Sequence, residues 1–286
     1  MVTPAVTRAR EPIGKYYAEN IDVNGVFRVP AALPSLCVRR GRSVAEVTAV
    51  APDLSGLIVL LSCVASKRTV DVLSGSVAKL HDGRLLVSLF VDYTDSGMSI
   101  GGMEQCLAGL GVVEKVSLNG ALAGGVAVNH HLFPLMMGDK RAVVFAVDYF
   151  REMLDQLRER LGEAANVLLY DMGRRYGVTF ARQVGEDTGL NRDGLVKMAL
   201  AEVQAAGWCI ASSYLADPSR RAWRVSVREL FECSKTRIDG GVNQSHFFRG
   251  FIAGLFGEVF GAASISCVET LCAGNRADLC EFAVWV

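Results

Sequence analysis

Four side chains near the carboxyl end of the chain are of the types that bind zinc. Glu269, Cys272 and Cys280 follow the spacing Glu-x2-Cys-x7-Cys, and His246 lies 23 positions before Glu269. One imidazole, one carboxylate and two thiols supply the four donors of a closed tetrahedral Zn²⁺ site. Because protein atoms would fill all four positions, we expect a structural zinc ion. Catalysis would require His246 to leave and open a position.

The first of these residues is expected at the start of a glycine-rich helix. Residues 246–261 predict a helix in which Gly250, Gly254 and Gly257 lie on one side, among large apolar side chains. Each glycine costs about 1 kcal/mol in a helix relative to alanine. Three of them together indicate that backbone, a strand or a ligand must approach this helix closely.

The other three donors are expected on a hairpin. The pattern predicts strands over 262–271 and 279–286, joined by the turn-rich loop 273–278. Cys272 and Cys280 then face each other across the mouth of the hairpin, which is a suitable arrangement for sharing one ion.

A ligand pocket is predicted between the glycine-rich helix and a helix over about 164–184. Aromatic and apolar side chains of the two helices would line it: Tyr170, Tyr176, Phe247, Phe248, Phe251 and Leu255. A mostly apolar lining with few polar groups suits a small aromatic or other apolar ligand. Aromatic residues at helical spacing also form ordinary core, so both interpretations stay open.

Other segments of this half predict further helices and a strand pair. The periodicity indicates helices over 149–161, 164–184 and 194–206, followed by strands over 208–215 and 222–231. The last helix and the two strands superficially resemble a winged helix with three arginines on the wing, Arg220, Arg221 and Arg224. Solvated surface charge explains these arginines more simply, because the chain is neutral overall.

The first half of the chain predicts a separate domain with the element order β-α-β-β-α-β. Alternating strands and apolar helical runs give that order over about 45–50, 53–65, 70–80, 84–93, 100–110 and 112–118. Residues 1–42 are an extension without assigned chemistry, and 120–139 are expected as a linker. We expect His130 and His131 in this linker to have no ligand role, because adjacent side chains point in different directions.

This order, with Asp53-x-x-Gly56 at the first strand–helix junction, resembles the ACT regulatory domain over residues 43–119. The resemblance implies a ferredoxin-like fold and an amino-acid site at Asp53 and Gly56, often formed where two copies pair. Gly56 would let a ligand approach the backbone, and the helix N-terminus would favour a carboxylate. The family commonly has proline where this chain has Ser55. The alternative is a domain that only mediates dimerisation.

The second half, residues 140–286, resembles the 4-vinyl reductase domain. The resemblance is most specific from His246 to Phe282, in the glycine-rich helix, the Glu-x2-Cys and a final cysteine before an aromatic strand. It implies an α/β fold related to the Bet3-like fold of transport particles. The family includes sensor domains of aromatic-responsive regulators and proteins linked to bacteriochlorophyll synthesis.

The resemblance also implies a ligand set for the metal. In sensor members of the family, three cysteines and one glutamate hold a zinc ion beside an apolar pocket. The glutamate and the last two cysteines match Glu269, Cys272 and Cys280 by position. His246 stands where the family has its first cysteine, so the fourth donor is His246 or one of two alternatives, Cys233 and Cys267.

Composition narrows the class of protein. Thirty basic residues balance thirty acidic ones, which gives no overall charge that favours nucleic acid or an anionic membrane. The start of the chain has no apolar signal-peptide region, and the longest apolar run, 57–64, is too short to span a bilayer. We therefore expect a cytoplasmic protein. Five cysteines stand singly among apolar neighbours and are expected as buried thiols: Cys37, Cys63, Cys106, Cys209 and Cys233.

Together these features predict an intracellular, homodimeric regulatory protein that senses a small molecule. The second domain would bind zinc and an apolar or aromatic ligand, and the first an amino acid. Neither a P-loop nor a convincing helix-turn-helix is found, so an unidentified partner protein would carry the output. One alternative is a tetrapyrrole vinyl-reductase-type enzyme or enzyme subunit, although no Gly-x-Gly-x-x-Gly follows an expected strand. Another is a non-catalytic assembly adaptor.

Overall fold

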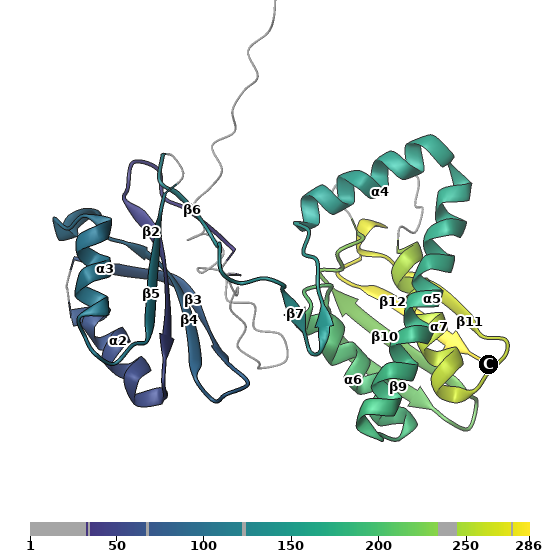
Figure 1. Ribbon diagram of the computed structural model, residues 1–286. Helices are drawn as coiled ribbons and strands as arrows, with labels where there is room; N and C mark the ends of the chain where they lie inside the picture. Colours follow the sequence, from purple (N-terminus) through teal and green to yellow (C-terminus); the bar gives the residue numbers. More distant parts are fainter. Residues whose placement is uncertain (1–32, 34, 67–68, 122–123, 234–244, 276) are drawn as a thin grey trace, which may run out of the picture. The chain divides into compact units, whose positions relative to one another are not determined.

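The computed structural model describes residues 33, 35–66, 69–121, 124–233, 245–275 and 277–286. Within this part the chain forms two compact units, with the boundary between Val143 and Val144. We call them unit 1 and unit 2 and describe each by itself (Figure 1). Most of the expected N-terminal extension, residues 1–32, lies outside the described residues. None of the described helices is long and apolar enough to cross a membrane.

Unit 1 is built on a four-stranded antiparallel sheet and two helices. Its main elements are β2 (Val44–Ala51), α2 (Leu54–Ser66), β3 (Asp71–Lys79), β4 (Leu85–Asp92), α3 (Ile100–Ala108) and β5 (Lys115–Gly120). The strands lie in the order β3-β4-β2-β5. This is the ferredoxin-like β-α-β-β-α-β arrangement expected from the sequence. The relationship to ACT domains stays a prediction.

One face of this sheet carries the apolar core of unit 1. Alternate residues of β2, from Ala45 to Ala51, point toward α2 and α3, which lie on the same face (Figure 1). Leu57 and Leu60 of α2 and Met103 of α3 complete the packing. The period-two alternation of a strand therefore sets which face of β2 is buried against helices.

The opposite face is partly covered by a second strand pair. β1 (Leu36–Val38) and β6 (Val126–Val128) pair antiparallel, and Ala127 packs with Val44 and Phe90. Two short strands follow, β7 (Met136–Met137) and β8 (Lys140–Arg141). Residues 120–139, expected as a linker, include β6, which belongs to unit 1 because Ala127 is buried against the sheet.

The two residues predicted to bind an amino acid have contacts within the chain. Asp53 Oδ1 accepts a hydrogen bond from the N–H of Gly56 at 2.9 Å, which caps the start of α2. A Cβ atom on Gly56 would lie 2.7 Å from the carbonyl oxygen of Val112, so the chain itself occupies the space beside this glycine. These contacts explain both residues without a ligand, and an amino-acid site at Asp53 and Gly56 stays a prediction.

Unit 2 combines, in its described part, another four-stranded antiparallel sheet with four helices. Its elements are α4 (Val147–Leu161), α5 (Glu163–Thr188), α6 (Arg192–Ala205), β9 (Ile210–Asp217), β10 (Ala222–Arg228), α7 (His246–Phe260), β11 (Ser266–Leu271) and β12 (Cys280–Trp285). The strands lie in the order β11-β12-β10-β9. Helices and strands follow one another as the periodicity predicts.

Helices α5 and α7 pack through interlocking glycines. A Cβ atom on Gly173 of α5 would lie 1.9 Å from the carbonyl oxygen of Phe247, and one on Gly250 of α7 would lie 2.1 Å from that of Tyr170. Two further glycines make equally close contacts with the facing helix, Gly177 and Gly254. Backbone of the neighbouring helix, rather than a ligand, is therefore what requires glycine here.

Candidate metal centre

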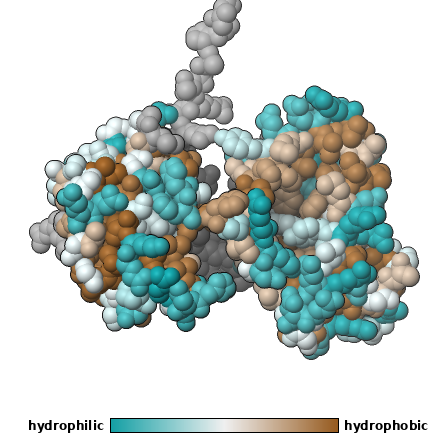
Figure 2. Space-filling view, viewed as in Figure 1, coloured by the Kyte–Doolittle hydropathy of each residue, from teal (hydrophilic) through white to brown (hydrophobic). Residues whose placement is uncertain are grey.

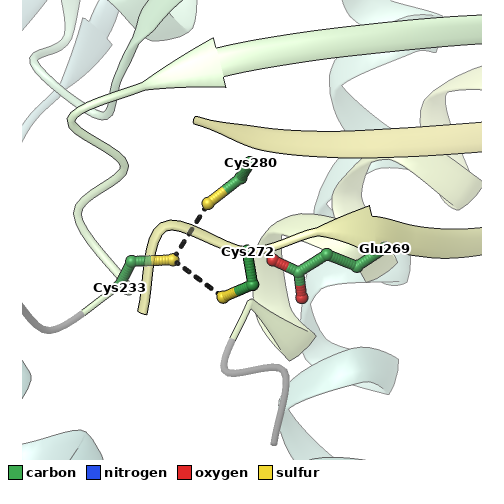
Figure 3. Close-up of side chains that lie close together, drawn as sticks. All are labelled: Cys233, Glu269, Cys272 and Cys280. Atoms are coloured by element: carbon green, nitrogen blue, oxygen red, sulfur yellow. Dashed lines mark hydrogen bonds between the residues drawn. The ribbon is translucent and has the colours of Figure 1, made fainter. Parts of the chain in front are cut away.

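Three thiols and one carboxyl group lie together at one end of the sheet of unit 2. They belong to Cys233, Glu269, Cys272 and Cys280, all buried, and their ligand atoms lie within 4.8 Å of one another (Figure 3). The Cys233 sulfur is 3.8 Å from the Cys272 sulfur and 3.2 Å from the Cys280 sulfur. With Zn–S bonds of about 2.3 Å, two sulfurs of a tetrahedral site are about 3.8 Å apart. The cluster is therefore close to the size that one shared ion requires.

Strand pairing positions the thiols. Cys280 is the first residue of β12 and pairs with Val227, near the end of β10. The chain that continues from β10 leads to Cys233, so these two thiols approach each other from neighbouring strands. Glu269 points inward from β11, on the other side of β12.

A register shift in β11 brings Cys272 to the same side as Glu269. Residues three apart on a regular strand point to opposite faces. Here the pairing with β12 shifts between Glu269 and Leu271. Thr270 and Leu271 are both exposed, and Cys272 is buried again. The extra residue of this bulge turns the thiol inward beside the carboxyl group.

Ser245 connects the cluster to the start of α7. Its hydroxyl donates to Glu269 Oε1 at 2.8 Å and lies 3.0 Å from the sulfur of Cys233. The backbone N–H of Ala273 donates to the sulfur of Cys280 at 3.4 Å. Outer contacts of this kind orient metal ligands in proteins. Ser245 is not recognisable as part of the cluster from sequence, because a serine before a helix is ordinarily an N-cap.

Glu232 caps α7 in place of Ser245, which makes no side-chain cap hydrogen bond. The Glu232 carboxylate accepts hydrogen bonds at 2.9 Å from the N–H groups of Phe247 and Phe248, and at 3.3 Å from Arg158 Nη2. Burial nevertheless raises the pKa of Glu232 to about 7. This residue, also missed from sequence, fixes the chain next to Cys233 against the first turn of α7.

The cluster disfavours negative charge unless a cation is bound. Burial raises the pKa of Glu269 to about 8. Contacts with Cys272 and Cys280, together with burial, raise the pKa of the Cys233 thiol. At Cys280 the hydrogen bond from Cys233 lowers the pKa, but Cys272 and burial outweigh it and raise the pKa to about 12. A divalent cation would stabilise the deprotonated donors, so metal binding would release protons.

His246, predicted as the fourth donor, is not part of this cluster. Its Nδ1 lies 3.3 Å from Nη2 of Arg249, one turn further along α7. The start of α7 turns Ser245 toward the carboxyl group instead, and the thiol of Cys233 is the fourth member of the cluster. Of the two alternatives kept from sequence, Cys233 is therefore the one that the fold brings into place.

Cys267, the other alternative donor, lies too far along β11. It is two residues before Glu269 and faces the same side of the sheet, where it is buried. Two residues of a strand span about 6.6 Å. Burial, the largest cause, raises the pKa of its thiol to about 12. Cys267 therefore behaves as a core residue beside the cluster.

Half of the residues predicted to line a ligand pocket are fully buried. Phe248, Phe251 and Leu255 have no exposed surface and belong to the core of unit 2. Tyr170 lies under the guanidinium of Arg249, whose carbon is 5.0 Å from the ring centre. These contacts are those of packed side chains.

The remaining two predicted residues belong to an aromatic cluster with exposed surface. Tyr176 and Phe247 surround Trp208, with ring centres 5.3 and 5.8 Å from the indole. Phe251 and Phe231 close the cluster from the core side, at 5.6 and 5.5 Å from the same indole. The sequence does not single out Trp208, because it is the first residue of the expected strand 208–215 and belongs to no motif.

The fold and the cluster define unit 2 as an α/β unit with a buried site of three cysteines and one glutamate. No protein-family profile and no curated protein matches the chain. Among solved structures, the chain is similar to the phenol-responsive sensory domain of the transcription activator PoxR with phenol. The identity is 16% and the TM-score 0.43, over 52% of this chain and 78% of that one.

Two further solved structures are also similar to this chain. One is a trafficking protein particle complex subunit 3 from Naegleria fowleri, covalently bound to palmitic acid (15% identity, TM-score 0.38, 49% of this chain and 93% of that one). The other is a vinyl-4-reductase family protein from Methanocaldococcus jannaschii (14%, 0.33, 50% and 82%). All three of these TM-scores are below 0.5.

Proposed function

We propose that this chain is a small-molecule-sensing regulatory protein in which one Zn²⁺ ion holds unit 2 together. The donors are Cys233, Glu269, Cys272 and Cys280. The proposal is carried by their convergence, since four buried donors of the types zinc prefers lie within 4.8 Å of one another. Keeping four such buried groups deprotonated side by side costs free energy unless a cation compensates their charge.

The ion is structural in this proposal. Four protein donors complete a tetrahedral zinc site and leave no position for water or substrate. The ion joins β11, β12 and the segment after β10, and Ser245 extends that connection to α7 through its 2.8 Å hydrogen bond to Glu269. Zinc therefore determines where the N-terminus of α7 lies on the sheet.

The same helix offers a place for a ligand to act. Phe247, two residues after Ser245, packs against Trp208 and Tyr176 in the partly exposed aromatic cluster. A small apolar or aromatic molecule among these rings contacts the first turn of α7, with the Tyr176 hydroxyl as a polar group. Its binding favours one position of α7 over others, which is how a ligand shifts a conformational equilibrium.

Exposed apolar side chains support a protein partner on unit 2. They lie on α4 and α5, at Tyr149, Met153, Leu161, Val167, Leu168 and Met172. Figure 2 shows hydrophobic surface on unit 2 in the region of these helices. Exposed apolar surface commonly marks protein contacts. The proposed occupant is a second copy of the chain, and a further protein receives the signal.

Metal analysis of the full-length chain tests the proposal. We expect one zinc ion per chain by elemental analysis, with Cys233→Ala losing the ion and His246→Ala keeping it. Native mass spectrometry reports the oligomeric state and any retained small molecule in the same experiment. The proposal fails if the wild-type chain takes up no zinc from an equimolar supply, or if Cys233→Ala binds it as well as wild type.

A separate measurement tests the ligand. Phenol and toluene serve as aromatic probes with and without a hydroxyl group, added to the zinc-loaded chain. We expect the fluorescence of Trp208 to change and the thermal midpoint to rise. Trp208→Phe shows how much of the fluorescence change comes from that indole. If neither quantity changes at millimolar probe, the aromatic cluster is core and no small aromatic ligand binds there.

A further inference from the structure

A small cavity lies between the two helices of unit 1. Its volume is about 10 Å³, and it is lined by Cys63 and Val64 of α2, by Val70 and Met98 from the connecting segments, and by three residues of α3, Met103, Cys106 and Leu107. Both helices cover the same face of the sheet (Figure 1). Four of the seven lining residues carry sulfur.

Sulfur is concentrated at this cavity and not spread through the core. The core between the helices and the sheet contains three sulfur-bearing residues, Cys63, Met98 and Met103, and all three line the cavity. Its other members are Ala, Val, Leu, Ile and Tyr. With eight Cys and eight Met in 286 residues, seven residues drawn at random contain on average fewer than one sulfur-bearing residue. Ordinary filling of gaps by methionine does not explain why two cysteines also line this cavity.

The size and chemistry of the cavity select its occupant. A water molecule needs roughly 10–15 Å³, so the cavity has room for one atom or bare ion and not for an organic molecule. Thiolate and thioether ligands together select Cu(I), whereas Zn²⁺ prefers thiolate, imidazole and carboxylate. Among the lining residues there is no imidazole and no carboxylate.

We propose that this cavity binds a single Cu(I) ion through the thiols of Cys63 and Cys106 and the thioethers of Met98 and Met103. Each thiol that coordinates the ion releases its proton to solvent, and no electron is transferred. Cys63 and Cys106 are only partly buried, so the ion can enter from the surface of unit 1. This site is independent of the zinc site proposed for unit 2, and either can be wrong without the other.

Anaerobic titration with Cu(I) acetonitrile complex, in competition with a chromogenic chelator, tests the site in the zinc-loaded full-length chain. Because thiols in general are ligands for Cu(I), including those of unit 2, the measured quantity is the difference between chains that vary only in unit 1. Wild type should bind one equivalent more than Cys63→Ser/Cys106→Ser. Met98→Leu/Met103→Leu keeps both thiols and nearly the same core volume. It should bind the ion at least about tenfold more weakly, since even outer contacts of a metal site are worth that much.

Cys37→Ser is the matched control, because Cys37 is a partly buried cysteine of unit 1 that does not line the cavity. It should bind as many equivalents as wild type. Urea unfolding verifies that each variant is folded. The proposal is overturned if wild type and the double-serine variant bind equal numbers of ions. If the double-leucine variant binds as tightly as wild type, the thioethers are not ligands and the proposed four-sulfur site is wrong.

Discussion

Each unit buries a glutamate on a sheet, and the two carboxyl groups have opposite surroundings. Glu46 in unit 1 has no exposed surface, and Glu269 in unit 2 is 4% exposed. Burial acts to raise the pKa of both. Hydrogen bonds outweigh it at Glu46, whose pKa is lowered, whereas the pKa of Glu269 rises to about 8. The neighbours of a buried carboxyl group, and not burial alone, decide its charge.

Glu46 is surrounded by N–H and O–H donors. Its Oε2 accepts a hydrogen bond from the N–H of His130 at 2.9 Å and lies 3.3 Å from Nδ1 of His131. Ser88 donates to Oε1 at 3.2 Å, and Asn119 donates to Oε2 at 3.3 Å. These donors stabilise the carboxylate as a structural anion. The histidine pair, expected to have no ligand role, thereby holds the segment after β6 to the sheet.

Glu269 has mainly thiols as neighbours. Ser245 donates to it through the hydroxyl at 2.8 Å and the backbone N–H at 3.4 Å, and the thiols of the three cluster cysteines lie close by in the described part of the chain. Thiols are weak donors. Such an environment suits a carboxylate that is bound to a cation. Hydrogen bonds from the chain stabilise the buried glutamate of unit 1 as an anion, whereas that of unit 2 lies in a cluster whose residues could hold a metal ion.

Loss of a metal donor should have the largest effect on stability. Cys280→Ala is expected to lower the free energy of unfolding of unit 2 in the zinc-loaded chain by about 4 kcal/mol or more, because the bound ion is lost. Urea unfolding followed by tryptophan fluorescence measures this, since all three tryptophans, at 208, 223 and 285, belong to unit 2.

The matched control is Cys209→Ala, a buried thiol outside the cluster. It should cost about 1 kcal/mol, as an ordinary small core truncation does. Chelation should bring wild type down to the level of Cys280→Ala and leave the effect of Cys209→Ala unchanged. Equal losses of unfolding free energy in Cys280→Ala and Cys209→Ala would show that unit 2 does not depend on a metal.

Substitution of a glycine between α5 and α7 should have the next largest effect on stability. Because this effect should not depend on zinc, it distinguishes the contribution of the helix contacts in unit 2 from that of the metal. Gly173→Ala places a methyl group 1.9 Å from the Phe247 carbonyl oxygen, so α5 and α7 must separate. We expect a loss of about 3 kcal/mol in chelated as well as in zinc-loaded protein. Gly185→Ala on the same helix meets its nearest atom at 3.8 Å and should be neutral or gain up to about 1 kcal/mol. If urea unfolding gives the same free energy of unfolding for Gly173→Ala and Gly185→Ala, then α5 and α7 tolerate separation.

Removal of the charge on Glu46 should have a smaller effect on the free energy of unfolding, and this effect should depend on pH. Glu46→Gln leaves donors unpaired and should cost about 2 kcal/mol at pH 7, with or without zinc. The pKa of Glu46 in the folded chain is lowered from its ordinary value of 4.5. Its contribution is therefore complete above that value and is lost as the pH falls through the folded pKa. Scanning calorimetry at pH 7 and pH 4 measures this loss of stability in the unfolding transition of unit 1, which contains no tryptophan and is therefore not followed by tryptophan fluorescence. The cost at pH 4 should be smaller.

The corresponding change in unit 2 should have the smallest effect on the chelated chain. With a pKa of about 8, Glu269 is mostly protonated at pH 7 without a metal, and glutamine resembles that form. We expect Glu269→Gln to alter the unfolding free energy of chelated protein by less than about 0.5 kcal/mol. Its zinc affinity should fall at least about tenfold. If chelated Glu269→Gln is destabilised as strongly as Glu46→Gln, the two glutamates do not differ in the way described.

Local patterns were sufficient for most of the architecture. The β-α-β-β-α-β order of unit 1 follows from alternation along β2 and β4 and from the apolar runs of α2 and α3. The placement of Cys272 and Cys280 at a hairpin mouth follows from the turn residues between two short strands. These inferences succeed because hydrophobic period and turn chemistry depend on residues adjacent in the chain.

The sequence by itself determined three members of the candidate metal cluster, Glu269, Cys272 and Cys280, because one hairpin carries them all. Only the tertiary structure decided the fourth. Cys233 is 36 positions before Glu269 and reaches it through the pairing of β10 with β12. His246 is closer in sequence, but the direction of the first turn of α7 points Ser245 at the carboxyl group instead. Strand neighbours and helix orientation arise from packing between distant segments, which no local spacing encodes.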